Sequence, residues 1–513
     1  MVNSANSARV LGIPPTIPGH PRLAGNPEIL SFERISMKVL RAFTVICVVL
    51  LAGLGVVSAQ SWTPLNNQPN ISASNPLLLS DGRVMVLDSG AQDWWALTPD
   101  INGSYQNGTW SQLASLPAGY APTYFASAVL PDSRVVVLGG EYNFGQGVWT
   151  TLGAIYTPKT NKWKTLNHPS GWTSVGDAQS VILPNGTFMV ANCCTTQEAL
   201  LDAKNLTWTA TGTGKGDIND EEGWTLLPGG EVLTVDANED NTNSEIYNPS
   251  TGSWSSAGST IVQLEDPASH ELGPAVLRPD GTVLYTGATG HNAVYNSVTA
   301  TWSAAPDFPK VNGQQLDIAD GPAALLPSGN VLVMTSPGVY STGAHFFEWN
   351  GSTFTAVPGT PNAPGDSSYY GNMLELPTGQ ILLTDFSSDV ELYNSTGSPE
   401  PAWAPTITKV GKKLTHGKTY PVKGTQLNGL SQGSAYGDDV QAASNYPLVR
   451  ITNNATGHVF YCFTDKPSSM GVATGSLIVT AHFEVPAGIE TGASQLEVVA
   501  NGIASNPVSV TIN

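Results

Sequence analysis

Charged residues and cysteines are scarce in this sequence of 513 residues. Charged side chains make up 12% of it, and 21 Lys and Arg stand against 40 Asp and Glu. So few basic groups exclude the positive patch by which proteins hold nucleic acid, and the excess of acid repels an anionic membrane surface. With only four cysteines, the chain has no disulfide framework of the kind that staples small secreted domains.

Long apolar runs are also missing, with one exception near the N-terminus. The basic stretch Met37–Arg41 precedes an apolar run over residues 42–57, and the small residues Ser58-Ala59 follow it. This pattern predicts a signal peptide over residues 37–59, with residues 1–36 as a non-native extension. The run is short for a membrane span, although an uncleaved anchor is the alternative. We therefore expect a secreted protein, extracellular or periplasmic.

The predicted cleavage makes the chain more acidic. Residues 1–59 hold five basic and two acidic residues, so 16 basic and 38 acidic residues remain and the net charge is −22. Such a charge suits a soluble exported protein, or one that binds cations. We expect no nucleic-acid partner, no membrane contact after cleavage, and a monomer.

Glycine and proline are abundant, and they recur in a repeated turn. A short turn rich in Pro, Asp, Ser and Gly appears seven times, usually before a β-branched apolar run. The turns begin at Ser80, Pro131, Pro184, Pro228, Pro279, Pro327 and Pro377. Their spacings lie between 44 and 53 residues, which fits the roughly 50-residue kelch repeat.

An aromatic pair recurs in the second half of the repeats. The pairs are Tyr156 with Trp163, Tyr247 with Trp254, Tyr295 with Trp302, and Phe347 with Phe354. Together with the turns, they predict an all-β fold: a seven-bladed kelch-type β-propeller over residues 60–402. The last blade lacks a fourth strand of its own, and Ser61–Leu65 resembles the outer strand of the first blade. We therefore predict that this N-terminal strand completes the last blade and removes two exposed sheet edges.

Beyond Trp403 the pattern changes to short alternating strands separated by Gly or Pro turns. Their number and the length of the segment predict an Ig-like β-sandwich over residues 403–513. The adjacent Cys193 and Cys194 follow a predicted strand of the third blade. A vicinal disulfide, a soft-metal site and two half-buried free thiols are the alternatives, and free thiols are favoured.

A seven-bladed kelch propeller followed by an Ig-like domain resembles the galactose oxidase and glyoxal oxidase family of copper-radical enzymes. The resemblance covers nearly the whole chain after residue 59. That family holds copper with two tyrosines and two histidines, and one of the tyrosines is thioether-linked to a cysteine. The resemblance implies Tyr124 as the radical tyrosine, Tyr142 as the aromatic residue that covers it, and Tyr369 as the second tyrosine.

The other copper ligands of that family are replaced here. Tyr370 stands at a histidine position, Ala73 stands near the cysteine position, and the loop Gly433–Val440 offers no histidine. Copper(II) favours imidazole nitrogen, and neutral phenols bind it poorly. The resemblance therefore implies the architecture of the family without its copper site, and copper is not expected as a cofactor.

Acidic residues stand seven or eight positions before the turns of other blades. They are Asp177, Glu221, Glu271 and Asp320, with His270 next to Glu271. These positions begin the innermost strands, so we expect the side chains to ring one mouth of the central channel, with Asp438 and Asp439 of the C-terminal loop descending onto it. Asp320, Glu271 and Asp438 are candidate ligands of a hard cation such as calcium, and the ring is a candidate sugar site. The alternative is a solvated rim with water-bridged carboxylates.

Two classes of function follow from this candidate site. The first is non-catalytic binding of a carbohydrate or an extracellular protein by the tyrosines Tyr124, Tyr142, Tyr369 and Tyr370 and by the acidic residues. The second is an exported enzyme, either a galactose oxidase-like oxidoreductase with altered metal ligands or a lyase or hydrolase. The missing copper ligands favour the first class, with no cofactor other than calcium.

Overall fold

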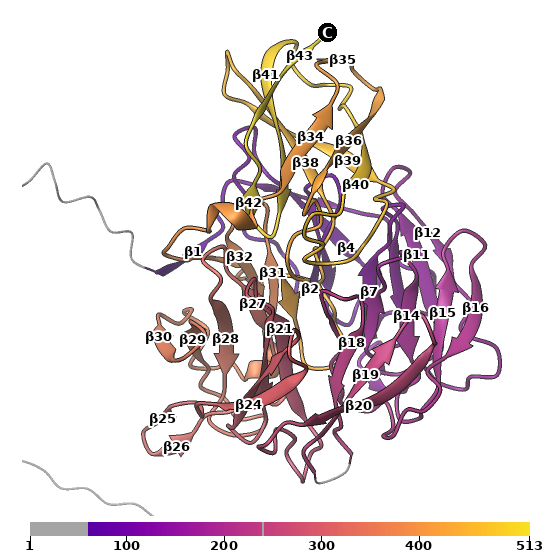
Figure 1. The fold of residues 1–513 in the computed structure, drawn as a ribbon, viewed down its shortest axis with the longest axis vertical. Helices are drawn as coiled ribbons and strands as arrows, with labels where there is room; N and C mark the ends of the chain where they lie inside the picture. The colour runs from indigo at the N-terminus through magenta and orange to yellow at the C-terminus, as the bar shows by residue number, and fades with distance from the viewer. Residues whose placement is uncertain (1–59, 239–240) are drawn as a thin grey trace, which may run out of the picture. The chain divides into compact units, whose positions relative to one another are not determined.

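The computed structural model describes residues 60–238 and 241–513, which form almost entirely β-structure (Figure 1). The signal peptide and the extension predicted over residues 1–59 lie outside these described residues. In the described part of the chain, no helix is long and apolar enough to cross a membrane.

Seven antiparallel sheets form the blades of a β-propeller, six of them four-stranded and the sixth blade extended by a fifth strand from the C-terminal segment. In each blade the strands are given from the innermost outward. Blade 1 contains β2 (Ala73–Leu78), β3 (Val84–Asp88), β4 (Trp94–Thr98) and β5 (Thr109–Gln112), and blade 2 contains β7 (Ala126–Val129), β8 (Val135–Leu138), β11 (Gly153–Thr157) and β12 (Lys162–Thr165). Blade 3 contains β13 (Ser180–Ile182), β14 (Phe188–Ala191), β15 (Glu198–Asp202) and β16 (Thr207–Thr211), and blade 4 contains β17 (Thr225–Leu226), β18 (Val232–Val235), β19 (Asn243–Asn248) and β20 (Ser253–Ser259).

The remaining blades follow in chain order. Blade 5 contains β21 (Leu272–Leu277), β22 (Thr282–Gly287), β23 (Asn292–Asn296) and β24 (Thr301–Ala305). Blade 6 contains β27 (Ala323–Leu325), β28 (Val331–Thr335), β29 (His345–Trp349) and β30 (Phe354–Val357), and blade 7 contains β31 (Asn372–Glu375), β32 (Ile381–Thr384), β33 (Glu391–Asn394) and β1 (Ser61–Pro64). Two small sheets stand between blade strands: β6 (Pro122–Thr123), β9 (Tyr142–Asn143) and β10 (Gln146–Gly147), and β25 (Lys310–Val311) with β26 (Gln314–Gln315). The inner strand β2 contacts both β7 and β31, so the first blade adjoins the second and the last.

The repeated proline and glycine of the turns link neighbouring blades. A Cβ on Gly186 would lie 2.6 Å from the Pro131 ring of the preceding blade, and one on Gly230 would lie 2.8 Å from the Pro184 ring. Both glycines have positive φ angles, +83° and +94°, which other residues adopt at a cost. The Pro-x-Gly pattern therefore serves the contact between blades as well as the turn itself.

The predicted aromatic pairs also join the blades. Trp163 lies 5.1 Å from Tyr156 across its own blade, and its indole N–H donates to the Ala114 carbonyl of the blade before, at 2.8 Å. One predicted pair is wrong: Phe354 lies opposite Trp349, at a ring distance of 4.7 Å, and not opposite Phe347. The turn between β29 and β30 has four residues, as in blade 2, but it begins one residue later relative to the aromatic residues, so Trp349 and Phe354 form the pair next to the turn.

The N-terminal strand completes the last blade, as the sequence predicted. Trp62 lies opposite Tyr393 in the pairing of β1 with β33, and its indole N–H donates to the Pro358 carbonyl at 2.8 Å. The ring is thereby closed by residues more than 300 positions apart, and β33 is paired on both sides instead of being left as an exposed outer edge.

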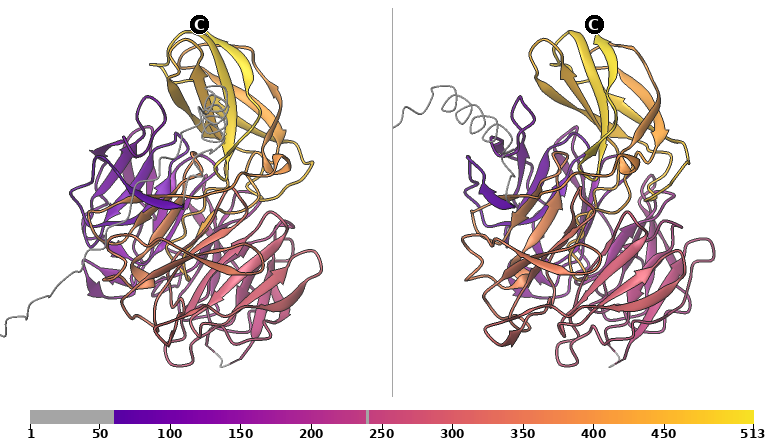
Figure 2. Two further views of the ribbon diagram at one scale, coloured as in Figure 1. Left: turned by 90° about the vertical axis from the view of Figure 1, so that its left-hand side faces the viewer. Right: turned by 60° about the vertical axis from the view of Figure 1, so that its left-hand side comes forward.

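The C-terminal segment forms a sheet that folds around its own apolar core. Its strand order is β34 (Thr406–Val410), β36 (Thr419–Thr425), β40 (Val479–Glu484), β39 (Val459–Asp465), β38 (Leu448–Asn453), β41 (Gly492–Ala500), β43 (Val508–Ile512) and β35 (Lys413–Leu414), with β42 (Ile503–Ala504) paired to β41. The core includes Val422, Ile451, Phe483 and Leu496, which lie on several of these strands. Two short 3-10 helices, η1 (Ser368–Tyr370) and η2 (Pro401–Trp403), precede this segment. Figure 2 shows its strands in orange and yellow from two further sides.

We expect an engineered disulfide to report the closure of the ring. Ser61 lies directly opposite Asn394, so the Cα atoms of a Ser61→Cys/Asn394→Cys variant fall within disulfide range. Oxidation should produce a cross-link seen as a mobility shift on non-reducing gels, and it should raise the free energy of unfolding by about 2–5 kcal/mol. The control is Ser61→Cys/Glu391→Cys, whose partners are three residues out of register. Equal cross-linking of the two variants would contradict this closure.

Candidate functional site

The site is built around a loop of the C-terminal domain, residues 431–441, which we call the channel loop. Its strand β37 (Ser434–Ala435) pairs with the inner strand β27 of blade 6. The Leu325 N–H donates to the Gly433 carbonyl at 2.7 Å, and the Ser127 hydroxyl donates to the Gln441 carbonyl at 3.0 Å. The channel loop thus contacts inner strands from different blades, and it is largely buried among them.

A cavity of about 560 Å³ opens where the channel loop meets the starts of the inner strands. Its lining includes most of the residues that the sequence predicted. The lining residues are Tyr124, Glu141, Tyr142, Asp177, Glu221, Ser269, Glu271, Asp320, Tyr340, Tyr369, Asp438 and Asp439. Seven of these twelve residues are carboxylic acids and none is basic, so no positive charge from the lining balances them.

Backbone strain concentrates on the same lining. Tyr124, Glu221, Asp320 and Tyr340 have φ angles of 52°, 59°, 52° and 58°, a region that non-glycine residues rarely occupy. Three of these four residues stand at the same place, just before the inner strands of blades 2, 4 and 6. Such strain persists only where the surrounding structure over-determines it, and it clusters at functional sites.

Three carboxylates meet at the centre of the cavity. Ligand atoms of Glu221, Glu271 and Asp320 lie within 4.8 Å of one another. Burial raises the pKa of Glu221 and of Asp320 well above the usual range, and the neighbouring carboxylates raise both further. Charge of one sign at this separation is unfavourable, so either protons or a cation must accompany it.

The two acids of the channel loop close the cavity from the other side. Asp438 and Asp439 retain 3% and 1% of their surface exposed, and neither Asp439 oxygen has a hydrogen-bond partner. Burial, and after it the neighbouring carboxylates, raise the pKa of both groups well above the usual range. An unpartnered buried carboxylate is unfavourable by several kcal/mol, and few native structures retain one without a reason.

Tight packing aims the channel loop at Asp320. A Cβ on Gly437 would lie 2.1 Å from Oδ1 of Asp320, and a Cβ on Gly223 would lie 2.4 Å from the Gly437 carbonyl oxygen. Glycine at position 437 is therefore the residue that lets the loop reach Asp320.

Tyrosines form the rest of the wall. The Tyr124 ring lies 6.2 Å from the Tyr142 ring and 6.4 Å from the buried Tyr436 ring, which is stacked behind it. Tyr340 donates its hydroxyl hydrogen to Glu271 and lies edge-on to Tyr369 at 5.5 Å. Burial, followed by the contact with Tyr370, raises the pKa of Tyr369 to about 12. These phenols are therefore neutral hydrogen-bonding groups at physiological pH.

Two predicted site residues are not among the lining residues. The His270 ring bonds to the Ala237 carbonyl at 3.1 Å and is half exposed outside the cavity. Tyr370 packs behind Tyr369 at a ring distance of 4.5 Å and against Phe386. The bond to Ala237 holds the His270 ring outside the cavity, and the next residue, Glu271, lines the cavity in its place.

The sequence did not indicate Glu141, Ser269 or Tyr340 as site residues. Glu141 directly follows the Gly139-Gly140 pair, and this was the available signal for it. Tyr340 belongs to the loop between β28 and β29 of blade 6, and the corresponding loops of the other blades differ from it in length. Periodicity finds residues at repeated positions, so it does not find residues in loops whose length varies from blade to blade.

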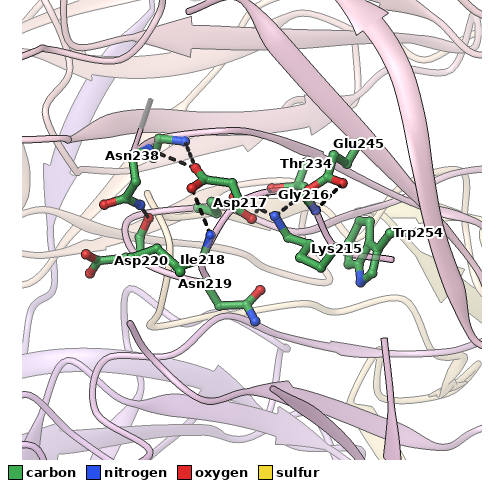
Figure 3. Close-up of polar contacts among 12 residues, drawn as sticks. Lys215, Gly216, Asp217, Ile218, Asn219, Asp220, Thr234, Asn238, Glu245 and Trp254 are labelled. Carbon is green, nitrogen blue, oxygen red and sulfur yellow. Dashed lines mark hydrogen bonds and ion pairs between the residues drawn. The ribbon is translucent and has the colours of Figure 1, made fainter. Parts of the chain in front are cut away.

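Glu221 follows a loop that is held by a buried ion network (Figure 3). The Lys215 ammonium donates to Glu222 at 2.8 Å and to Glu245 at 2.6 Å, and its side chain is fully buried. Burial alone would lower the pKa of Lys215, but the two carboxylates outweigh it and raise the pKa. Asp217 accepts the N–H groups of Ile218, Ala237 and Asn238. The loop from residue 215 to residue 222 is thus fixed at both ends.

The adjacent cysteines lie beside this loop. The structure joins Cys193 and Cys194 in a disulfide, so the expectation of free thiols is wrong. The Cys194 N–H donates to the Asn219 carbonyl at 2.7 Å, and the Asn219 N–H donates to Thr195 at 2.7 Å. This close pairing with the loop places the two sulfurs side by side next to Asp220.

The donor set of the cavity does not fit copper. Its described lining contains oxygen ligands only, from carboxylates, phenols and one hydroxyl, with neither histidine nor cysteine. Copper(II) favours imidazole or thiolate donors, whereas carboxylate-rich sites suit calcium, magnesium or manganese.

No family model and no curated protein matches the sequence. Among solved structures, a fungal alcohol oxidase of the AA5 family in complex with copper covers 89% of this chain and all of its own, at 13% identity and a TM-score of 0.49. Virginiamycin B lyase from Staphylococcus aureus covers 66% of this chain and 99% of its own, at 8% identity and a TM-score of 0.47. The extracellular domain of a two-component system of B. thetaiotaomicron covers 89% of this chain and 59% of its own, at 11% identity and a TM-score of 0.44.

We expect Lys215→Met to destabilise the protein by about 3–5 kcal/mol, because it leaves two buried carboxylates without their cation. Urea unfolding at pH 7 measures this loss. The loss should shrink as the pH falls, because burial raises the pKa of Glu222 well above its usual range and protonation of this group removes part of the unpaired charge. Lys204→Met, at an exposed position of blade 3, is the control and should stay within about 0.5 kcal/mol of the wild type. A comparable loss in the two variants would show that the network does not stabilise the fold.

Proposed function

We propose that this protein binds a calcium-like divalent cation in the acidic cavity and, at the same cavity, a carbohydrate. The single observation that supports the proposal best is the pair of channel-loop acids, because Asp439 is buried with both oxygens unpartnered and faces other carboxylates. A cation offsets this concentration of negative charge, which no lining residue offsets.

The proposed ligands are the central acids Glu221, Glu271 and Asp320, with Asp438 or Asp439 from the channel loop. Calcium accepts six to eight oxygen ligands in variable geometry, which suits carboxylates contributed by several blades and by a separate loop. Magnesium demands a stricter octahedral arrangement and keeps more of its water, so it is the weaker candidate.

The carbohydrate part of the proposal rests on the tyrosines. Tyr124, Tyr142, Tyr340 and Tyr369 present neutral hydroxyl groups and ring faces around the acids. A sugar offers the complementary combination of hydroxyl groups and an apolar ring face, and pockets with few, well-placed polar groups are the usual ligand sites.

The finer assignments made from the sequence belong to the same proposal. We infer that the blades are of the kelch type, that the C-terminal domain is Ig-like with its boundary near residue 403, and that the chain is exported and acts as a monomer. The alternative function, a galactose oxidase-like oxidoreductase with altered ligands, finds no support in the donor set, since the lining lacks the imidazole and thiolate donors that copper favours.

We expect calcium to raise the melting temperature of the purified protein, and Asp439→Asn to abolish most of that shift. A ligand at 100 times its dissociation constant stabilises the native state by about 2.7 kcal/mol. In the presence of a chelator, the same variant should be more stable than the wild type, because it removes an unpaired buried charge. Calorimetric titration and thermal unfolding measure both effects.

The control for this experiment is Asp307→Asn, which removes an exposed acid that pairs only with His291 on the surface. It should leave the calcium shift unchanged. Absence of a calcium shift in the wild type, or an equal loss in the two variants, would overturn the proposed cation site.

We also expect the pH dependence of stability to reverse the usual acid denaturation. The acids of the cavity have folded pKa values above their unfolded values of about 4. Such groups stabilise the fold fully below pH 4, and their contribution is lost as the pH rises toward the folded pKa values. In a chelator, urea unfolding should show this decline above pH 4, and calcium should reduce it. A decline of the same size in Asp320→Asn/Asp439→Asn would assign it to other groups.

A further inference from the structure

A hairpin at the rim of the cavity exposes an apolar surface. It consists of β9 and β10 joined by a two-residue turn, Phe144-Gly145, in which both residues have positive φ. Within and just after it, four large apolar side chains are 42% to 50% exposed. They are Phe144, Val148, Trp149 and Leu152. Exposed apolar surface of this density on one short segment marks an interaction site.

The hairpin is continuous with the cavity. Glu141 and Tyr142 at its base line the cavity, and the Val148 N–H donates to the Glu141 carbonyl at 2.8 Å, which fixes the returning arm next to them. A Cβ on Gly176 would lie 3.5 Å from the Trp149 ring, so the indole packs over this glycine. The next residue, Asp177, is again a lining residue. Trp149 therefore stands between blades 2 and 3, at the edge of the cavity.

We propose that Trp149 is a stacking platform for a second sugar unit, so that the ligand is an uncharged oligosaccharide with one unit in the cavity and the next on the indole. This inference rests on the proposed function and names the class of its ligand. The half-exposed indole offers a flat apolar face outside the cavity, and Tyr142 offers another ring on the opposite arm of the hairpin. A ligand that crosses the rim meets polar groups on one side and aromatic faces on the other.

The negative charge around the hairpin indicates which ligand its apolar surface binds. The acids beside the hairpin and the net charge of the chain repel an anionic polysaccharide or an anionic lipid surface. A second copy of the same chain would bring an equally acidic surface to the contact. An uncharged oligosaccharide avoids these repulsions, since its hydroxyl groups donate to carboxylates and its C–H faces cover aromatic rings.

The test measures how the affinity for a sugar depends on the length of the oligosaccharide. It uses the full-length mature protein with calcium present. The probes are glucose, xylose, mannose and N-acetylglucosamine, each as a monosaccharide and as its linear tetrasaccharide, together with tetragalacturonate as an anionic comparison. We expect one tetrasaccharide to bind about tenfold more tightly than its monosaccharide, and Trp149→Ala to remove that gain. Trp149→Phe should retain most of it, and Val298→Ala, at an exposed apolar position of blade 5, should change nothing.

Failure of the platform and failure of the proposed function are distinguishable in this design. If the Trp149→Ala variant still bound a tetrasaccharide more tightly than its monosaccharide, the platform would be overturned while the proposed cation and sugar site would stand. Calcium binding without binding of any tetrasaccharide, preferential binding of tetragalacturonate, or a Trp149-dependent dimer on sedimentation would also overturn it. The absence of a calcium shift would instead reject the cation site. Trp149→Ala should keep the wild-type calcium shift, which shows that the variant is folded.

Discussion

The channel loop is the constraint on which the site depends. Backbone groups of Gly433 and Gln441 bond to blades 6 and 2, and the Gln432 side chain accepts the Leu226 N–H of blade 4 at 2.7 Å. These bonds satisfy backbone and side-chain groups that would otherwise be buried without partners, so the loop holds one position in the channel. Because the loop is held on several sides, Asp438 and Asp439 stay buried against the other acids although nothing in the lining compensates their charge.

The protein buries acidic groups in two different ways, and the contrast is informative. In blade 4, Glu222 and Glu245 share the ammonium group of Lys215, so the network is compensated within the chain. The residue next to Glu222 in the sequence, Glu221, lines the cavity. Its neighbours there are carboxylates, and the described lining supplies no cation to pair with it. The first arrangement stabilises the fold, whereas the second opposes it unless something else binds. Adjacent residues of one loop thus serve structure and ligand binding separately.

The sequence predicted the parts of the fold that repeat. The seven turns, the aromatic pairs and the strand that closes the ring all follow from periodicity, and the acids before the inner strands follow from the same register. The errors fall where one blade departs from the repeat. Phe354 lies opposite Trp349 because the turn of blade 6 begins one residue later relative to its aromatic residues. The His270 ring bonds to the Ala237 carbonyl outside the cavity, and Tyr340 lies in a loop whose length differs from blade to blade. The cysteine pair was misjudged because its state depends on backbone geometry that spacing does not encode.

Strain, uncompensated charge and exposed aromatic surface coincide at one end of the propeller channel. Each is unfavourable to folding, and each is absent from the regular strands that surround the site. Tyr124, Glu221 and Asp320 hold positive φ angles that glycine would hold without strain, yet glycine would remove the side chains that form the cavity. The large, regular ring of blades supplies enough packing and hydrogen bonding for the fold to tolerate the strained backbone, the uncompensated charge and the exposed aromatic surface. A ligand that is positively charged at its centre and amphipathic at its edge would relieve the charge and cover the aromatic surface, which is the combination that a hydrated cation with a bound oligosaccharide provides.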